Sequence, residues 1–278
     1  MTVAYGTRLT EVVTERGRLC VGIDPHPELL DAWDLPRSAA GLERCARGMV
    51  EAVGSQVAVF KPQSAFFEAY GSAGIAVLER TLAHIAEAGA LSLLDVKRGD
   101  MSTSMAAYAA AYLADGAPLA ADAITVSPYL GFGSLAGAIA LALEHGRGVY
   151  VLALTSNPEG REFQHARIED GRMVGQVVVG EASRYNPAGG LGSVGVVVGA
   201  TIGRTGADFS GLNGSILAPG IGAQGGTASD LAKVFGPAAS LVLPTTSREV
   251  MAAGPDPAAL RATAARIRGE MEAVLGVG

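Results

Sequence analysis

Short apolar segments rich in β-branched residues recur along the chain, and most are followed by a longer segment with a different pattern. A short, continuous apolar run is typical of a strand that is buried on both faces. Eight such runs can be distinguished, at residues 19–24, 57–61, 91–97, 122–127, 149–155, 194–199, 215–220 and 240–245. The pattern therefore predicts eight short buried strands spread over nearly the whole chain.

The segments between these runs are rich in alanine and favour helices. Ser38 is a suitable helix cap before residues 39–53, and Gly71 and Gly74 weaken the first half of a helix predicted at 65–88. Further helices are expected at 103–114, 135–145, 173–185, 228–235 and 257–275. The glycine-rich segment after Thr201 gives no clear helix.

Strands that alternate with helices indicate a parallel sheet. Eight strand–helix units in 278 residues predict a closed (β/α)8 TIM barrel, an α/β fold that forms one domain over residues 1–278. A doubly wound open sheet is the alternative. It is disfavoured because Gly22 and the residues after it do not form the GxGxxG turn into a helix that such folds often carry.

Composition narrows the possible partners. The net charge is −6 and no basic cluster stands out, so a nucleic-acid partner is not expected. The mean hydropathy is +0.31, but the apolar stretch 135–143 is shorter than the ~18 residues that a membrane span needs. The amino terminus lacks an apolar targeting segment, and Cys20 and Cys45 have no CxxC spacing. We therefore expect a cytoplasmic protein that does not contact membranes.

Charged residues stand at the ends of the first three predicted strands. Asp24 ends the first, Lys61 the second, and Asp95 and Lys97 the third, with Asp100 in the loop that follows. Residues two apart on a strand share a face, so these side chains are expected to meet at the barrel mouth. Buried charges need partners, and Lys61, Asp95, Lys97 and Asp100 sum to zero. The alternative is an ordinary ion pair that closes a layer of the barrel.

A second candidate site follows the seventh predicted strand, where residues 218–230 are rich in glycine. Glycines allow backbone N–H groups to approach an anion, and Thr227 or Ser229 could cap the next helix. Arg248 follows the eighth predicted strand. A phosphate held by the loops after strands seven and eight is a recurring feature of barrels. The alternative is that Arg248 pairs with Glu249 or Asp230 at the surface.

At this point the chain resembles a known family. The matching stretches run from residue 19 to residue 248 and read LCVGIDPHPELL, VFKPQSAFFEAYG, LLDVKRGDMSTSMAAYA, TVSPYLG, LTSNPEG and APGIGAQGG, with SRE after strand eight. They resemble orotidine 5′-phosphate decarboxylase, in its longer bacterial subgroup. The resemblance implies a homodimeric barrel that converts orotidine 5′-monophosphate (OMP) to UMP without a cofactor or metal.

The resemblance also implies roles for the charged residues. Lys97 would protonate C6 as carbon dioxide leaves, and Asp95 would lie beside the substrate carboxylate. Lys61 and Asp100 would complete the charge network. Asp24 and Lys61 would contact the ribose hydroxyls, while Asp100 would reach the ribose in the neighbouring subunit's site.

The remaining expected contacts bind the substrate. The phosphate would be held by residues that follow strands seven and eight, namely Gln224, Gly225, Gly226 and Arg248. Ser127 would contact the pyrimidine. Ser104 stands where the family usually has threonine, and Arg248 follows PTT rather than a GRS-like turn. Residues 159–172 form a long loop of undetermined role.

Three other functions stay open at the level of sequence. A metal-dependent sugar-phosphate decarboxylase or synthase also carries DxKxxD, but Lys61 replaces the acidic ligand expected at strand two. A Schiff-base aldolase would use Lys61 or Lys97, which the flanking carboxylates keep protonated. A barrel that only binds nucleotide phosphates would not need the set formed by Asp95, Lys97 and Asp100.

Overall fold

A closed barrel of eight parallel strands forms the centre of the protein, which we describe from a computed structural model covering residues 2–222 and 225–276. Each strand pairs with the next, and β1 closes the barrel against β8. The strands are β1 (Cys20–Ile23), β2 (Val59–Pro62), β3 (Leu91–Arg98), β4 (Ala123–Val126), β5 (Gly148–Leu154), β6 (Gly192–Val198), β7 (Gly214–Pro219) and β8 (Val242–Thr246). This confirms the predicted (β/α)8 barrel and contradicts the open-sheet alternative.

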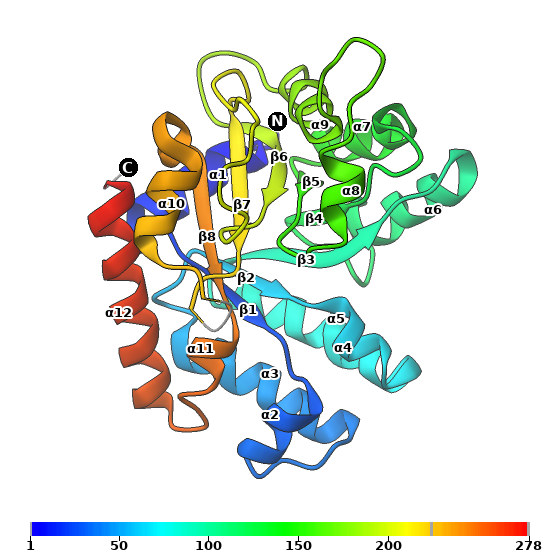
Figure 1. The fold of residues 1–278 in the computed structure, drawn as a ribbon. Helices are drawn as coiled ribbons and strands as arrows, with labels where there is room; N and C mark the ends of the chain where they lie inside the picture. The colour runs from blue at the N-terminus through cyan, green and yellow to red at the C-terminus, as the bar shows by residue number, and fades with distance from the viewer. Residues whose placement is uncertain (1, 223–224, 277–278) are drawn as a thin grey trace.

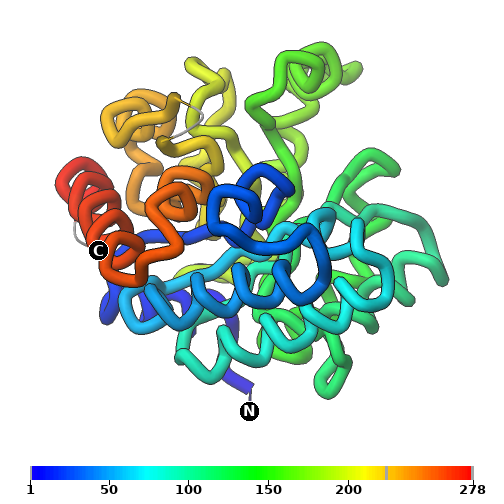
Figure 2. The backbone as a smooth tube through the Cα atoms, turned by 90° about the horizontal axis from the view of Figure 1, so that it is seen from below, coloured from blue at the N-terminus to red at the C-terminus, as the bar shows by residue number. Residues whose placement is uncertain are grey.

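Helices surround the strands (Figures 1 and 2). They are α1 (Tyr5–Arg16), α2 (Pro27–Ala32), α3 (Ala39–Val53), α4 (Ser64–Glu68), α5 (Gly71–Glu87), α6 (Ser102–Leu113), α7 (Ala136–Glu144), α8 (Gly160–Gln164), α9 (Val174–Ser183), α10 (Ala228–Phe235), α11 (Arg248–Met251) and α12 (Pro257–Leu275). Two 3₁₀ turns, η1 (Phe132–Leu135) and η2 (Gly236–Leu241), precede α7 and β8.

Two details of the helices differ from the sequence-based expectation. The single helix predicted at 65–88 is divided into α4 and α5, and Gly71 begins α5 with a φ of +60°. Glycine adopts this left-handed conformation without a steric cost, which explains where the chain turns. Four helices, α1, α2, α8 and α11, were not predicted from the sequence. Between β6 and β7, the structure forms no helix, in keeping with the glycine-rich sequence there.

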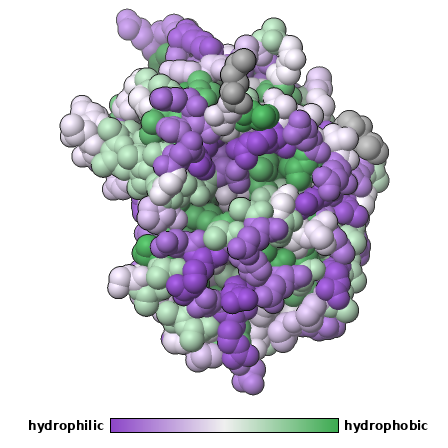
Figure 3. All heavy atoms as spheres, turned by 180° about the vertical axis from the view of Figure 1, so that it is seen from behind, coloured by the Kyte–Doolittle hydropathy of each residue, from purple (hydrophilic) through white to green (hydrophobic). Residues whose placement is uncertain are grey.

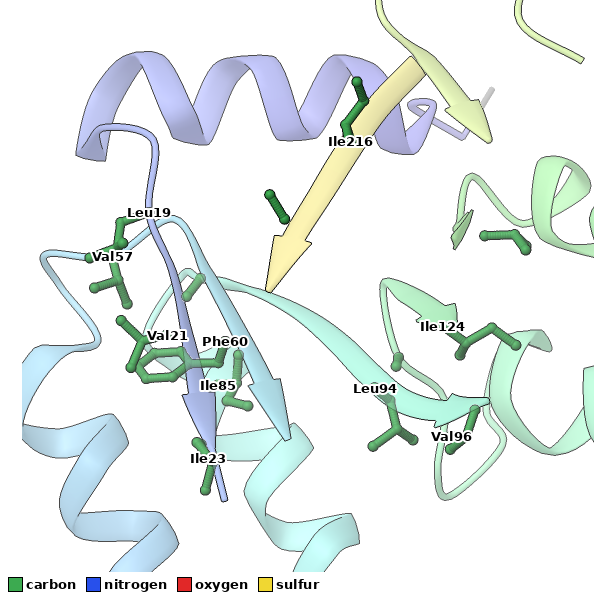
Figure 4. Packing of buried hydrophobic residues seen from close by; sticks show 14 of the residues in the cluster. Leu19, Val21, Ile23, Val57, Phe60, Ile85, Leu94, Val96, Ile124 and Ile216 are labelled. Atoms are coloured by element: carbon green, nitrogen blue, oxygen red, sulfur yellow. The ribbon is translucent and has the colours of Figure 1, made fainter. Parts of the chain in front are cut away.

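Apolar residues pack in two layers, one between the barrel and its helices and one inside the barrel. In the outer layer, Val21 and Phe60 lie with Ile85 of α5 (Figure 4). The inner layer includes Cys20, Leu93 and Leu217, and residues of α1 join it. Because successive residues of a strand face opposite sides, both layers are filled by nearly continuous apolar runs.

Residues of helix α1 pack against the inner layer. The hydroxyl groups of Tyr5 and Tyr150 lie 3.1 Å apart in the interior, and burial raises the pKa of Tyr150 to about 12. Tyr5 and Leu9 of α1 pack with the inward-facing strand residues. Apolar side chains therefore fill the barrel interior.

The molecular surface is mixed in character. Figure 3 shows polar residues spread across one face, with small apolar areas between them. Among the described residues, the helices are all too short or too polar to cross a membrane.

Candidate active site

Asp95, at the carboxyl end of β3, is the centre of the candidate site. It is only 7% exposed, and it lies between two lysines. Lys61 Nζ donates to Asp95 Oδ2 at 3.1 Å, and Lys97 Nζ donates to Asp95 Oδ1 at 2.7 Å. Three of the charged side chains that were expected at the barrel mouth therefore meet, as predicted from the two-residue spacing on the strands.

Two neutral side chains complete the contacts of this carboxylate. Gln63 Nε2 donates to Oδ2 at 3.0 Å, and Thr125 Oγ1 donates to Oδ1 at 2.7 Å. Each oxygen of Asp95 thus accepts one hydrogen bond from a lysine and one from a neutral group. Sequence reasoning missed both neutral donors, although Gln63 shares the face of Lys61 two residues earlier.

The surrounding charges fix the protonation of Asp95 and of Lys61. Burial alone would raise the pKa of Asp95, but the ammonium groups of Lys61 and Lys97 outweigh it and hold the pKa well below its usual range. Burial alone would lower the pKa of Lys61, but Asp95 and Asp24 outweigh it and raise the pKa. Asp95 is therefore ionised and Lys61 protonated at neutral pH.

The two lysines differ in exposure. The side chain of Lys61 is 6% exposed, whereas that of Lys97 is 45% exposed. Lys97 also has an unusual backbone, with a φ of +47°. Its strand shifts register against β4 between Leu94 and Arg98, as a β-bulge does. The left-handed backbone and the register shift thus occur at Lys97, whose amine is the more accessible of the two.

A pocket of about 290 Å³ opens over these groups. Its apolar lining comes from inward-facing residues of β5, β6 and β7, and its rim from the loops that follow the strands. A broader groove of about 680 Å³ adjoins it and shares Asp24, Gln63, Asp95, Lys97 and Arg248. Both volumes are of the order found for small-molecule sites, ~300–1,000 Å³.

The glycine-rich turn after β7 forms one side of this pocket. Gly220, Gly222 and Gly225 have φ values of +112°, +76° and +86°, which only glycine adopts without strain. The turn is closed by hydrogen bonds from Gly222 N to Gly226 O at 2.9 Å and from Gly226 N to Gly220 O at 3.0 Å. Gln224, a predicted phosphate contact, lies outside the described residues.

Arg248 begins α11 beside this turn and lines both the pocket and the groove. The alternative partners considered from the sequence are engaged elsewhere, because Glu249 accepts from Arg266 and Asp230 accepts from Thr227. Within the described residues, the guanidinium of Arg248 makes no hydrogen bond or ion pair of its own. It is available to bind an anionic ligand.

Asp24 lines both spaces as well. Its Oδ1 is buried and accepts no hydrogen bond from any described residue. A buried carboxylate oxygen without a donor is costly. Its position on the pocket wall suits a hydroxyl group of a ligand.

Five predicted site residues do not line the pocket or the groove of their own subunit. Two of them, Gly225 and Gly226, line a separate hollow that also contains Arg248. Asp100 Oδ1 accepts from the Met101 backbone N–H at 2.7 Å, and Ser104 is exposed on α6, which follows β3 at the edge of the molecule (Figure 1). Ser127 Oγ donates to the carbonyl of Lys97 at 3.0 Å. Sequence spacing alone did not distinguish these positions from those inside the pocket.

The first residues after β5 line another part of the pocket, whereas residues 159–172 are not part of its lining. Gln164 of α8 accepts from Thr155 N at 2.7 Å and donates to Thr155 Oγ1 at 2.7 Å, so it fastens the loop to the end of β5. Ser156 and Asn157 line the pocket here. Their motif was noticed in the sequence, but no role was assigned to them.

No group of three or more potential metal-ligating side chains occurs within residues 2–222 and 225–276. The charged groups at the mouth are instead paired with one another. The fold and this mouth define the class of protein: a (β/α)8-barrel enzyme whose charged pocket suits a phosphorylated ligand.

Comparison with known proteins identifies the family. Residues 17–263 match the model of the orotidine 5′-phosphate decarboxylase / HUMPS family, and the chain belongs to this family. Orotidine 5′-phosphate decarboxylases from Salinispora tropica and Streptomyces coelicolor are 58% and 54% identical to it over 273 and 268 residues. The matched regions cover 98% of both chains in the first comparison and 96% of both in the second.

Solved structures agree. A Streptomyces avermitilis chain assigned to orotidine 5′-phosphate decarboxylase superposes with a TM-score of 0.96 at 53% identity, covering 99% of this chain and 97% of that one. Leishmania donovani OMP decarboxylase gives a TM-score of 0.77 at 30% identity, covering 98% and 99%. The longer bacterial subgroup is not named by these matches and stays a prediction.

The buried carboxylate generates a stability prediction. Asp95→Asn leaves Lys61 buried without its charge partner, and we expect it to lower the free energy of unfolding by about 3 kcal/mol at neutral pH. Because folding lowers the pKa of Asp95, its stabilisation is complete above an unfolded pKa of about 4 and is lost as the pH falls toward the folded value.

Urea denaturation at pH 7 and at about pH 3 measures both effects, and the gap between the variant and the wild type should narrow at the lower pH. Asp31→Asn, which removes an exposed partner of Arg37, is the control and should change little. An Asp95→Asn variant as stable as the wild type at neutral pH would contradict the ion-pair account.

Proposed function

We propose that this chain decarboxylates OMP to UMP in pyrimidine synthesis, the reaction for which its family and relatives are named. The observation that carries the proposal is the ionised Asp95 held between Lys61 and Lys97 at the base of a pocket that also contains Arg248. Fixed charges of this kind can act on a developing carbanion, and an arginine on the pocket wall can bind a phosphate.

Loss of carbon dioxide from C6 of OMP leaves an electron pair on a carbon without a conjugated electron sink. An enzyme can lower this barrier by charges aimed at the developing carbanion. In our proposal Asp95 lies beside the departing carboxylate and destabilises it. The C6–carboxylate bond breaks, carbon dioxide leaves, and the electron pair on C6 takes a proton from Lys97 Nζ. Lys61 keeps Asp95 ionised throughout.

The rest of the substrate supplies binding energy. Arg248 and the turn containing Gly225 and Gly226 would hold the phosphate, because arginine and backbone N–H groups both donate to phosphate oxygens. Binding energy from such a remote group can be used to place the reacting centre against fixed charges. Asp24 Oδ1, together with Lys61, would bind the ribose hydroxyls.

The pyrimidine would lie against the apolar side of the pocket. The polar residues Ser156 and Asn157 also line the pocket, and we propose that they contact the base. Ser127 stays a predicted contact, and its hydroxyl is meanwhile engaged with the Lys97 carbonyl.

We also propose that the chain forms a homodimer in which each subunit completes its partner's site. Asp100 and Ser104 do not line the pocket of their own subunit. Large apolar side chains are exposed nearby, on the loops after β3 and β4: Met101 is 58% exposed and Tyr129 is 73% exposed. A dimer interface there would cover them and carry Asp100 toward the neighbouring ribose.

A cytoplasmic location fits the two cysteines. Cys20 and Cys45 are buried and unpaired, and burial raises the pKa of each thiol to about 12. Cysteines of this kind are compatible with a reducing compartment. We retain the location as a proposal.

Lys97→Ala tests the proton donor. We expect kcat for OMP to fall by about a thousandfold or more, because both the proton and the positive charge at C6 are lost. Binding of UMP should be retained, as measured by isothermal titration calorimetry. Lys233→Ala, at an exposed lysine on α10, is the control. Appreciable turnover by Lys97→Ala would refute the assignment.

Arg248→Ala tests the phosphate contact. We expect kcat/KM for OMP to fall by about a hundredfold, because a charge-assisted contact to the phosphate is lost. Turnover of the nucleoside orotidine, which has no phosphate, should change little. Arg184→Ala removes an exposed arginine elsewhere and serves as the control. An unchanged kcat/KM for OMP in Arg248→Ala would sink the assignment.

Hybrid dimers test the sharing of sites. Lys97→Ala chains and Asp100→Ala chains, each expected to be inactive as a homodimer, are co-expressed with different affinity tags. The hybrid dimer is then isolated by purification on both tags in turn. If Asp100 completes the partner's site, one pocket of the hybrid has both substitutions and the other has none. We then expect about half of the wild-type activity per dimer. If Asp100 serves its own subunit, both pockets carry a lesion and the hybrid is inactive.

A further inference from the structure

Thr125 of β4 contacts Lys97 and Asp95 through a single hydroxyl group. Its Oγ1 accepts a hydrogen bond from the Lys97 backbone N–H at 3.0 Å and donates one to Asp95 Oδ1 at 2.7 Å. The same Oδ1 accepts from Lys97 Nζ at 2.7 Å. These contacts form a closed ring from the Lys97 backbone through Thr125 and Asp95 to the Lys97 amine.

The backbone that Thr125 holds is strained. Lys97 has a φ of +47°, a conformation that costs an L-residue about 1–2 kcal/mol. Such a residue keeps this conformation only where its surroundings impose it. The register shift between β3 and β4 occurs at the same place, so Lys97 N–H binds the side chain of Thr125 rather than a backbone carbonyl.

The residue directly after β4 binds the carbonyl group of Lys97. Ser127, which follows Thr125 by two residues and so lies on the same side of the chain, donates through Oγ to the Lys97 carbonyl at 3.0 Å. The N–H group of Lys97 is thus bound by a hydroxyl of β4, and its C=O group by the hydroxyl of Ser127, the residue after β4. Thr125 is the more deeply buried of the two and is the one that also contacts Asp95.

We propose that Thr125 is a positioning residue for the reaction. By holding the Lys97 backbone in its left-handed conformation and the Asp95 carboxylate in one rotamer, it sets the place of the Lys97 amine over the pocket. This inference rests on the proposed decarboxylation for its effect on rate, but its effect on Lys97 can be measured without turnover.

The chemistry of the position limits which residue can act in this way. The group must accept from a backbone N–H and donate to a carboxylate, which a hydroxyl can do. Serine retains the hydroxyl and loses only a methyl group. Valine has nearly the same shape as threonine but leaves the N–H of Lys97 and one lone pair of Asp95 without partners.

Kinetics of Thr125→Val and Thr125→Ser test the proposal. We expect Thr125→Val to lower kcat by about ten- to a hundredfold, because misplacing the reacting group slows the chemical step. The KM for OMP and the Kd for UMP should change by less than about threefold. Thr125→Ser should restore kcat to within about threefold of the wild type.

The matched control is Thr246→Val. Thr246 ends β8, is equally buried, and its hydroxyl has no hydrogen-bond partner among the described residues. Its replacement removes a buried hydroxyl from a barrel strand without touching the ring, and kcat should stay unchanged. Melting temperatures of all three variants show whether each one folds.

A second measurement does not depend on activity. The chain has three lysines, Lys61, Lys97 and Lys233, so NMR of lysine labelled with ¹³C at Cε gives one signal for each. Thr125→Val should move the signal of Lys97 and leave that of Lys233 in place, both with and without UMP. If Thr125→Val does not fold, the same comparison is made on Thr125→Ala.

The outcomes separate this inference from the proposed function. A wild-type protein without OMP turnover would refute the function and leave the NMR test standing. An unchanged Lys97 signal, an unchanged kcat in Thr125→Val, or a loss of kcat in parallel with UMP affinity would overturn the positioning role. Failure of Thr125→Ser to restore kcat would do the same.

Discussion

The site depends on one buried carboxylate that accepts four hydrogen bonds. Asp95 is ionised because Lys61 and Lys97 outweigh the cost of its burial, and Gln63 and Thr125 saturate its remaining lone pairs. Without the lysines, a buried charge would be expelled or neutralised. With them, a fixed negative charge and a protonated amine lie side by side, which is the electrostatic arrangement that the proposed mechanism uses for decarboxylation.

The closed barrel makes this arrangement possible. The carboxyl ends of adjacent parallel strands meet at one mouth, so β2, β3 and β4 bring Lys61, Asp95 and Thr125 together although they are far apart in the chain. The filled interior beneath, including Tyr5 of α1 against Tyr150, keeps the strands at fixed positions. The loops after β5, β7 and β8 then shape the pocket without having to supply rigidity to the charged groups.

Much of this was predictable from the sequence, because a buried strand that ends in charges is unusual and the two-residue period tells which charges meet. The period placed Lys61, Asp95 and Lys97 together. It did not reveal Thr125 or the direction of the Asp100 side chain, because Lys97 has a left-handed backbone and β3 shifts register there, so alternation no longer predicts direction. Neutral donors such as Gln63 carry no charge signal, and the break between α4 and α5 follows from the backbone at Gly71.

The most direct test is the ultraviolet absorbance of OMP after addition of the purified protein, with EDTA present. The account predicts rapid conversion to UMP, because the charges that act on C6 are side chains of the protein itself. No conversion by a folded protein would contradict the account and would favour the metal-dependent sugar-phosphate alternative, which added magnesium and a sugar phosphate would then reveal.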